Sequence, residues 1–158
     1  MGSFYTNADG LQQQYGTRGV LSGAKEAAGV SVKKYLILDF NGVGLVDTTP
    51  VLDLSAARLP AGAYVIAATL LVETLFVGAT ATLDIGTFKA SDGTALDIDG
   101  FVAAAAVATL TAGADIAGAG AQIGTIIAED TYVIATYNTA AFTAGKARCV
   151  IEYVMSMQ

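Results

Sequence analysis

From about residue 31 onward the sequence alternates between apolar and other residues with a period of two, and turn residues interrupt the alternation. This pattern is typical of β-strands that bury one face, because successive side chains on a strand point to opposite sides of the sheet. In residues 34–40, for example, Leu36, Leu38 and Phe40 share one side, and Asn41-Gly42 follows as a turn signal. The alternation predicts an all-β fold, an antiparallel sandwich or barrel.

Further stretches extend this pattern. Residues 64–77 are rich in Val, Ile, Thr and Leu, which predicts a strand buried on both faces for part of its length. In residues 79–85, apolar residues expected to face the core alternate with polar residues expected to face outward. Residues 131–138 and 146–154 also have strand patterns, and we expect the connection 139–145 to join them as a hairpin. The residues expected to be mostly buried are Leu36, Leu38, Phe40, Ile66, Leu83, Ile85, Val133, Cys149 and Ile151.

Two stretches rich in alanine and glycine break the alternation. The stretch "FVAAAAVATL", residues 101–110, predicts one short helix at most, because alanine is the best helix former but glycines bracket the stretch closely. The stretch "ADIAGAGAQIG", residues 114–124, is interpreted as a flexible loop. Its glycines are spaced one residue too long for a dinucleotide fingerprint. The nearby "FTAGKAR" lacks the first glycine and the Ser or Thr of a phosphate-binding loop.

Charge and hydropathy exclude two classes of partner. The net charge is −6 and the basic residues are dispersed apart from Lys33-Lys34, which argues against nucleic-acid binding. The chain is 54% hydrophobic, but its longest uncharged runs, Gly100–Ala114 and Thr131–Gly145, are 15 residues each. A membrane-spanning helix needs ~20 apolar residues. The start "MGSFYTNADG" also lacks the basic and apolar regions of a secretory signal. We therefore expect a soluble protein.

The residues needed for catalysis are scarce. The chain has no histidine, the commonest general base and metal ligand. Its single cysteine, Cys149, alternates onto the apolar side of its strand and is interpreted as a core thiol. The acidic group Asp92, Asp97 and Asp99 could supply oxygen ligands to calcium, or a carboxylate pair for glycoside cleavage, but plain turns account for it better. We expect a protein that is not an enzyme and has no cofactor or metal.

The first 30 residues have a different composition from the rest. They contain scattered glycines, three consecutive glutamines, and aromatic residues that follow no steady period. Such a segment cannot form its own core, so we interpret residues 1–30 as an extended attachment arm and residues 31–158 as the β-sandwich domain. In the arm, Phe4, Tyr5 and Tyr15 would anchor on a partner, and Arg18 would meet an acid or a carbonyl.

The order of four segments carries a resemblance to a known class. The segments are "SFYTNADGLQQQYGT", "LPAGAYVIAATLLVETLFVGATATLDIGTF", "DIDGFVAAAAVATL" and "AAFTAGKARCVIEYV". Together they resemble the decoration or cement proteins on the heads of short-tailed bacteriophages. The resemblance implies a jelly-roll-like β-sandwich with a terminal arm, assembled as a homotrimer on the capsid exterior. The implied partner is the major capsid protein, and no catalytic residue is implied.

One other function of the same fold class stays open at this point. A carbohydrate-binding β-sandwich module of a phage tail or a host surface would also be an acidic all-β trimer without histidine. Calcium or sugar bound in the Asp-rich loops would distinguish it. An enzyme is the weakest alternative.

Overall fold

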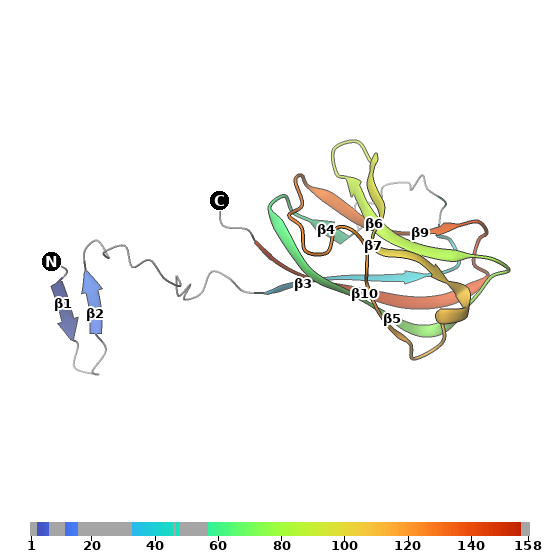
Figure 1. Ribbon diagram of the computed structural model, residues 1–158, viewed down its shortest axis with the longest axis horizontal. Helices are drawn as coiled ribbons and strands as arrows, with labels where there is room; N and C mark the ends of the chain where they lie inside the picture. Colours follow the sequence, from blue (N-terminus) through green and yellow to red (C-terminus); the bar gives the residue numbers. More distant parts are fainter. Residues whose placement is uncertain (1–2, 7–11, 16–32, 46, 48–56, 156–158) are drawn as a thin grey trace. The chain divides into compact units, whose positions relative to one another are not determined.

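The computed structural model of the protein describes residues 3–6, 12–15, 33–45, 47 and 57–155. The chain divides into two compact units, residues 1–30 and residues 31–158. In the first unit, strands β1 (Ser3–Thr6) and β2 (Gln12–Tyr15) form an antiparallel pair (Figure 1). The aromatic residues of this unit follow no steady period, and the sequence did not indicate these two strands.

The second unit is a sandwich of two four-stranded antiparallel sheets (Figure 1). One sheet has the order β3-β10-β5-β8 and the other the order β4-β9-β6-β7. Among the described residues the only helical element is the 3₁₀ turn η1, so the predicted all-β antiparallel sandwich is confirmed. The elements are β3 (Lys34–Asn41), β4 (Ala57–Leu59), β5 (Ala63–Val77), β6 (Thr82–Lys89), β7 (Ala95–Ala106), η1 (Val107–Thr109), β8 (Asp115–Ala117), β9 (Thr131–Asn138) and β10 (Ala144–Met155).

The eight strands of the sandwich pair in a nested pattern. The first, β3, pairs with the last, β10, and β4 pairs with β9. Inside these, β5 pairs with β8, and β6 pairs with β7. All four pairs are antiparallel, as they would be in one long hairpin folded over on itself. This nesting places strands far apart in the sequence side by side in each sheet.

The core lies between the two sheets and mostly follows the predicted alternation. The exception is β6, where residues 83–88 are all buried, so the expectation that Asp84 faces outward is wrong. Leu83 and Ile85 of β6, Val133 of β9, and Cys149 and Ile151 of β10 are buried in one cluster, as predicted. Three other predicted core residues, all on the edge strand β3, are half-buried and pack against this cluster: Leu36, Leu38 and Phe40.

The prediction for Ile66 is wrong, as is the expectation that β5 is covered on both faces. Ile66 is 37% exposed. It lies at an irregularity of the β5–β10 register, where Glu152 faces Ala67 and Tyr153 faces Val65, so Ile66 is an extra residue in its strand. Further along β5, Leu71 and Leu75 are exposed because their side chains alternate with buried ones.

Residues 101–110, for which at most one short helix was expected, are mostly strand. Residues up to Ala106 belong to β7, where Phe101 and Val102 are buried and Val102 faces Ile85 of β6. Only η1 is helical. Helix propensity is a weak preference. Burial of these two large side chains against β6 outweighs the helix propensity of the alanines.

The expected hairpin between residues 131–138 and 146–154 does not form. Both segments are strands, but β9 lies in one sheet and β10 in the other, so the connection crosses between the sheets. Alternation identifies a strand without identifying its partner, because pairing is decided by distant segments.

Residues 114–124 are not the flexible loop that their composition predicts, because they include β8 and their glycines are fixed between the two sheets. Gly118 donates a hydrogen bond to Ala68 of β5 (2.8 Å), and Gly120 donates one to Phe101 of β7 (3.1 Å). A Cβ atom on Gly120 would lie 2.2 Å from the backbone of Gly100, so only glycine allows this approach. The stretch therefore closes one side of the sandwich.

Candidate interaction surface

The four residues predicted to bind a partner lie in the first unit or outside the described residues. Phe4 and Tyr5 are on β1 and Tyr15 is on β2. In the backbone register Phe4 faces Gln14 and Tyr5 faces Gln13. Arg18 lies outside the described residues. Their role as partner anchors stays a prediction.

The acidic residues after β6 form a turn and a carboxylate pair. Asp92 accepts hydrogen bonds from the backbone N–H and the hydroxyl of Thr94, at 2.9 and 2.8 Å, which lower its pKa. Burial, together with a hydrogen bond and the charge of Asp99, raises the pKa of Asp97. In the part of the chain that the structure describes, no three or more carboxylate or thiol groups are placed to hold a metal ion.

Asp84 is a buried carboxylate on β6. It is only 5% exposed, and one oxygen accepts a hydrogen bond of 2.5 Å from the N–H of Ala104 on β7. Ala104 has a φ of +46°, in the left-handed region that alanine rarely adopts. Burial raises the pKa of Asp84, against the opposing effect of this hydrogen bond. The hydrogen bond to Asp84 thus fixes an irregular part of β7, while burial makes the ionised form of this carboxylate less favourable.

We expect Asp84→Asn to increase the free energy of unfolding at pH 7. The asparagine oxygen can still accept the Ala104 N–H, while the buried charge is removed. Because the folded-state pKa of Asp84 is raised, the wild type gains stability from this group as the pH falls toward the unfolded pKa of about 3.9. The advantage of the variant should therefore shrink on acidification and vanish below about pH 4, as urea unfolding at the two pH values can show.

Asp92→Asn is the matched control for this prediction. The pKa of Asp92 is lowered in the folded state, so its charged form stabilises the fold at pH 7 and that stabilisation is lost as the pH falls through the folded pKa. This variant should therefore be less stable than the wild type at pH 7. A loss of stability at pH 7 in Asp84→Asn would show that the buried charge itself is required.

Cys149 has the environment of a core thiol. It is fully buried, and burial raises its pKa to about 12. A thiol with such a pKa is almost entirely protonated at neutral pH, whereas the thiolate is the nucleophile. The interpretation of Cys149 as a core residue is confirmed.

At one end of the sandwich, four chain segments without a charged residue come together. The N–H of Thr143, before β10, donates to the carbonyl of Val77 at the end of β5 (2.8 Å). The N–H of Val107, in η1, donates to the carbonyl of Ala81 before β6 (3.3 Å). We call this surface the uncharged end, and it comprises residues 42–45, 74–81, 106–112 and 138–144.

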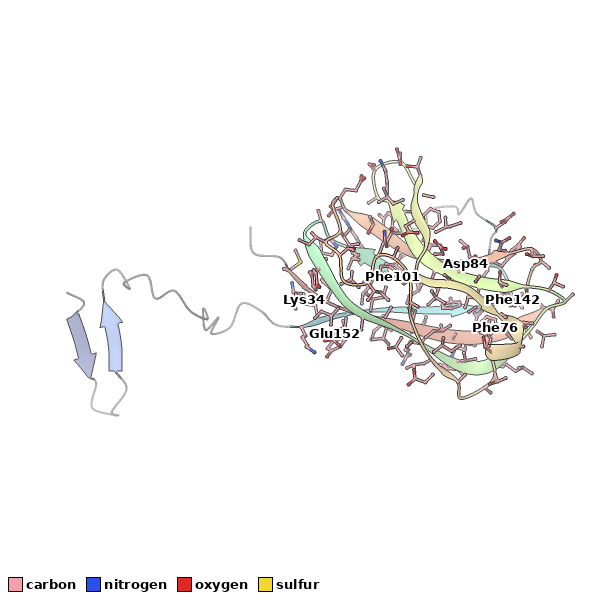
Figure 2. The ribbon with its side chains drawn as sticks, in the orientation of Figure 1. Lys34, Phe76, Asp84, Phe101, Phe142 and Glu152 are labelled. Atoms are coloured by element: carbon pink, nitrogen blue, oxygen red, sulfur yellow. The ribbon has the colours of Figure 1, made fainter. Side chains whose placement is uncertain are left out.

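Phe76 of β5 lies near Phe142 at this end of the sandwich (Figure 2). Its N–H donates to the carbonyl of Leu110 (3.1 Å). Its ring centre lies 5.1 Å from that of Phe142, edge to face, and 6.2 Å from that of Phe40. Gly145 has a φ of +132°, and a Cβ there would lie 2.4 Å from the Phe76 ring. The aromatic ring therefore packs directly on the backbone and joins the segments.

The surface of the uncharged end is apolar and mostly small. Val43, Leu75 and Val77 are its large exposed apolar residues, at 60%, 47% and 47% exposure. Most of the other exposed side chains on the four segments are alanine and threonine. Depletion of charge with retained apolar area is typical of the centre of a protein interface.

The ion pairs of the described sandwich lie outside these segments. The Lys146–Glu73 pair (2.7 Å) and the Arg148–Asp39 pair (2.6 Å) lie on the outer face of the β3-β10-β5-β8 sheet. Lys34 and Glu152 are at the opposite end from Phe76 and Phe142 (Figure 2). The other described pairs are Lys33–Glu152, Arg58–Asp130 and Lys89–Glu129. Among the described residues, the four segments of the uncharged end therefore contain no ion pair, although the Lys146–Glu73 pair adjoins them on the outer face of the sheet.

The sequence signal for this surface is the pair of long uncharged runs, Gly100–Ala114 and Thr131–Gly145. In the sequence alone these runs bear only on a membrane-spanning helix, for which they are too short. The described residues include no helix long and apolar enough to cross a membrane. Instead, parts of both runs meet at the uncharged end.

Comparison with known proteins identifies the fold. No protein-family model matches the sequence, and no curated protein is significantly similar to it. Chains in three solved phage structures have a similar fold. One is in the capsid asymmetric unit of cyanophage Pam1, with a TM-score of 0.55 and 20% identity over 88% of this chain and 94% of that chain.

The other two comparisons agree. A chain in the capsid of Ralstonia phage GP4 has a TM-score of 0.53 and 19% identity, over 87% of this chain and 92% of that one. A chain in the acidic stable capsid structure of Helicobacter pylori bacteriophage KHP30 has a TM-score of 0.54 and 18% identity, over 81% and 91%. The protein therefore has a β-sandwich fold that also occurs in chains of phage capsid structures.

Proposed function

We propose that the protein is a capsid decoration, or cement, protein of a bacteriophage. In this role it is a non-catalytic structural virion protein that binds the outer surface of the capsid and stabilises it. The observation that carries the proposal is the fold shared with chains in three phage capsid structures, over 81–88% of this chain. Because the identities are 18–20%, the likeness supports the role through the fold and not through matching residues.

The chemistry of the sandwich is in keeping with a structural role. The only thiol is buried with a pKa of about 12, and the chain has no histidine to activate a nucleophile. The nested pairing of eight strands is the order expected of a jelly roll, a common architecture of viral capsid domains. Both features support a structural, non-catalytic role.

In the proposed assembly, three copies form a homotrimer on the capsid exterior and residues 1–30 attach it to the major capsid protein. Phe4, Tyr5 and Tyr15 are the anchors of this arm, and Arg18 pairs with an acid or a carbonyl of the shell. A segment that becomes ordered on its target can cover a large surface, and several copies acting together increase the avidity. A short-tailed phage is the source implied by the sequence resemblance.

The test is binding to phage heads that lack the protein. Purified full-length chain is added to such heads, and the bound copies are counted after sedimentation. We expect saturable binding at high copy number and a higher melting temperature of the decorated shells. Bound protein should also be accessible to added protease in intact particles.

Three results would contradict the proposal. The first is failure to sediment with the heads, and the second is protection from protease inside intact particles. The third is binding to host cells or their polysaccharides without binding to heads, which would favour the carbohydrate-binding alternative.

A further inference from the structure

We propose that the uncharged end is the surface through which copies of this chain contact one another. This inference rests on one part of the proposed function, the homo-oligomer, and adds the residues that form it. It concerns contacts between sandwiches, whereas the arm is assigned to the shell.

The charge distribution favours a second copy as the partner. Each chain carries a net charge of −6, so two copies repel one another when their acidic surfaces approach. Like charges brought together across an interface cost several kcal/mol. The uncharged end brings no formal charge to the contact from either copy. It is therefore a surface on which identical acidic molecules can meet without this cost.

The neighbouring surface does not oppose such a contact. On the outer face of the β3-β10-β5-β8 sheet, Lys146 and Arg148 are paired with Glu73 and Asp39 within one molecule. These pairs balance their own charges next to the end of β5. An interface that extended from the uncharged end onto this face would meet matched charges and not a carboxylate cluster.

The shape and stiffness of the surface also suit an interface between copies. Small alanine and threonine side chains allow two backbones to approach closely, and Val43, Leu75 and Val77 offer apolar area to bury. The segments are held by backbone hydrogen bonds and by the packing around Phe76, so little conformational freedom is lost on association. A surface fixed in this way is preorganised for a partner of complementary shape.

The test is a full-length variant with two carboxylates on this surface, Leu75→Asp with Val77→Asp. Both residues are exposed in one copy, so the fold should tolerate the change, and circular dichroism checks this. If copies meet here, the two charges per copy become buried and unpaired, and the dissociation constant between copies should rise at least about 100-fold. Sedimentation velocity over a dilution series measures it. Ile66→Asp, on the same strand but outside the uncharged end, is the matched control and should keep the wild-type assembly.

Several outcomes would overturn the inference. One is an unchanged oligomer in the double variant, and another is a larger effect in Ile66→Asp. If the wild-type protein is a monomer, copies do not contact one another and the inference is wrong. Binding to heads would still test the decoration role separately. If the double variant stays assembled but loses head binding, the uncharged end contacts the shell. Should the double variant fail to fold, Thr80→Asp in the turn between β5 and β6 replaces it, with the same expected dissociation.

Discussion

Replacing Phe76 with alanine is expected to lower the free energy of unfolding by about 3–5 kcal/mol, since a buried aromatic side chain is lost and a cavity is left. Phe76 is 1% exposed and contacts Phe142 edge to face. Its neighbours cannot easily fill the space, because the ring lies against the backbone of Gly145, whose carbonyl accepts a hydrogen bond from the N–H of Gly42 (2.9 Å). Urea unfolding monitored by circular dichroism measures the loss.

The matched control for this prediction is Leu75→Ala, at the adjacent and exposed position of the same strand. Its side chain is 47% exposed, so its removal should change the stability of the folded monomer by less than about 1 kcal/mol. If the two variants are equally stable, the aromatic cluster does not organise the end of the sandwich. The two residues also separate fold from assembly, because Leu75 is assigned to the contact between copies and Phe76 to the support beneath it.

The sequence predicts the strands of the sandwich well because the information that defines them is local. The alternation of Leu83 and Ile85 with their neighbours, and of Cys149 and Ile151 with theirs, identifies the strands and these buried side chains. It does not indicate that β6 is buried on its other face as well, where Asp84 lies. It also fails where a strand departs from regular pleating. Ile66 is exposed because the register of β5 against β10 gains one residue beside it, which no local pattern indicates.

The pairing of the strands could not be predicted for a different reason. The neighbours β9 and β10 follow one another in the sequence, yet β9 pairs with β4 and β6, and β10 with β3 and β5. Their partners are determined by the burial of whole sheets against each other. The same holds for the uncharged end: each uncharged run is visible in the sequence, but its meeting with the others depends on the sandwich.

Deleting residues 2–29 is expected to leave the sandwich folded and to abolish its attachment to capsids. The chain divides into two compact units at residues 30 and 31, and the described core cluster is drawn from residues 36–155. The truncated protein should therefore melt cooperatively at nearly the temperature of the full chain. Scanning calorimetry measures the melt, and sedimentation with phage heads measures the attachment.

A full-length variant tests whether the four predicted anchors are responsible for the attachment. It carries Phe4→Ala, Tyr5→Ala, Tyr15→Ala and Arg18→Ala, and it should lose most of its occupancy on heads while keeping the length of the arm, because aromatic and arginine residues tend to dominate binding energy. Truncated protein that binds heads at full occupancy would show that residues 1–30 are not the attachment. If the truncated protein fails to fold, residues 1–30 are required for the stability of the domain.

The same truncation separates attachment from assembly. If the uncharged end joins the copies, the truncated protein should still form the wild-type oligomer although it no longer binds heads. The Leu75→Asp with Val77→Asp variant should do the opposite: it keeps the arm, loses the oligomer, and binds heads more weakly, because each monomer then attaches through one arm without the gain from several linked arms. If the truncated protein is also monomeric, residues 1–30 join the copies. The assignment of attachment to the arm and of assembly to the uncharged end would then be wrong.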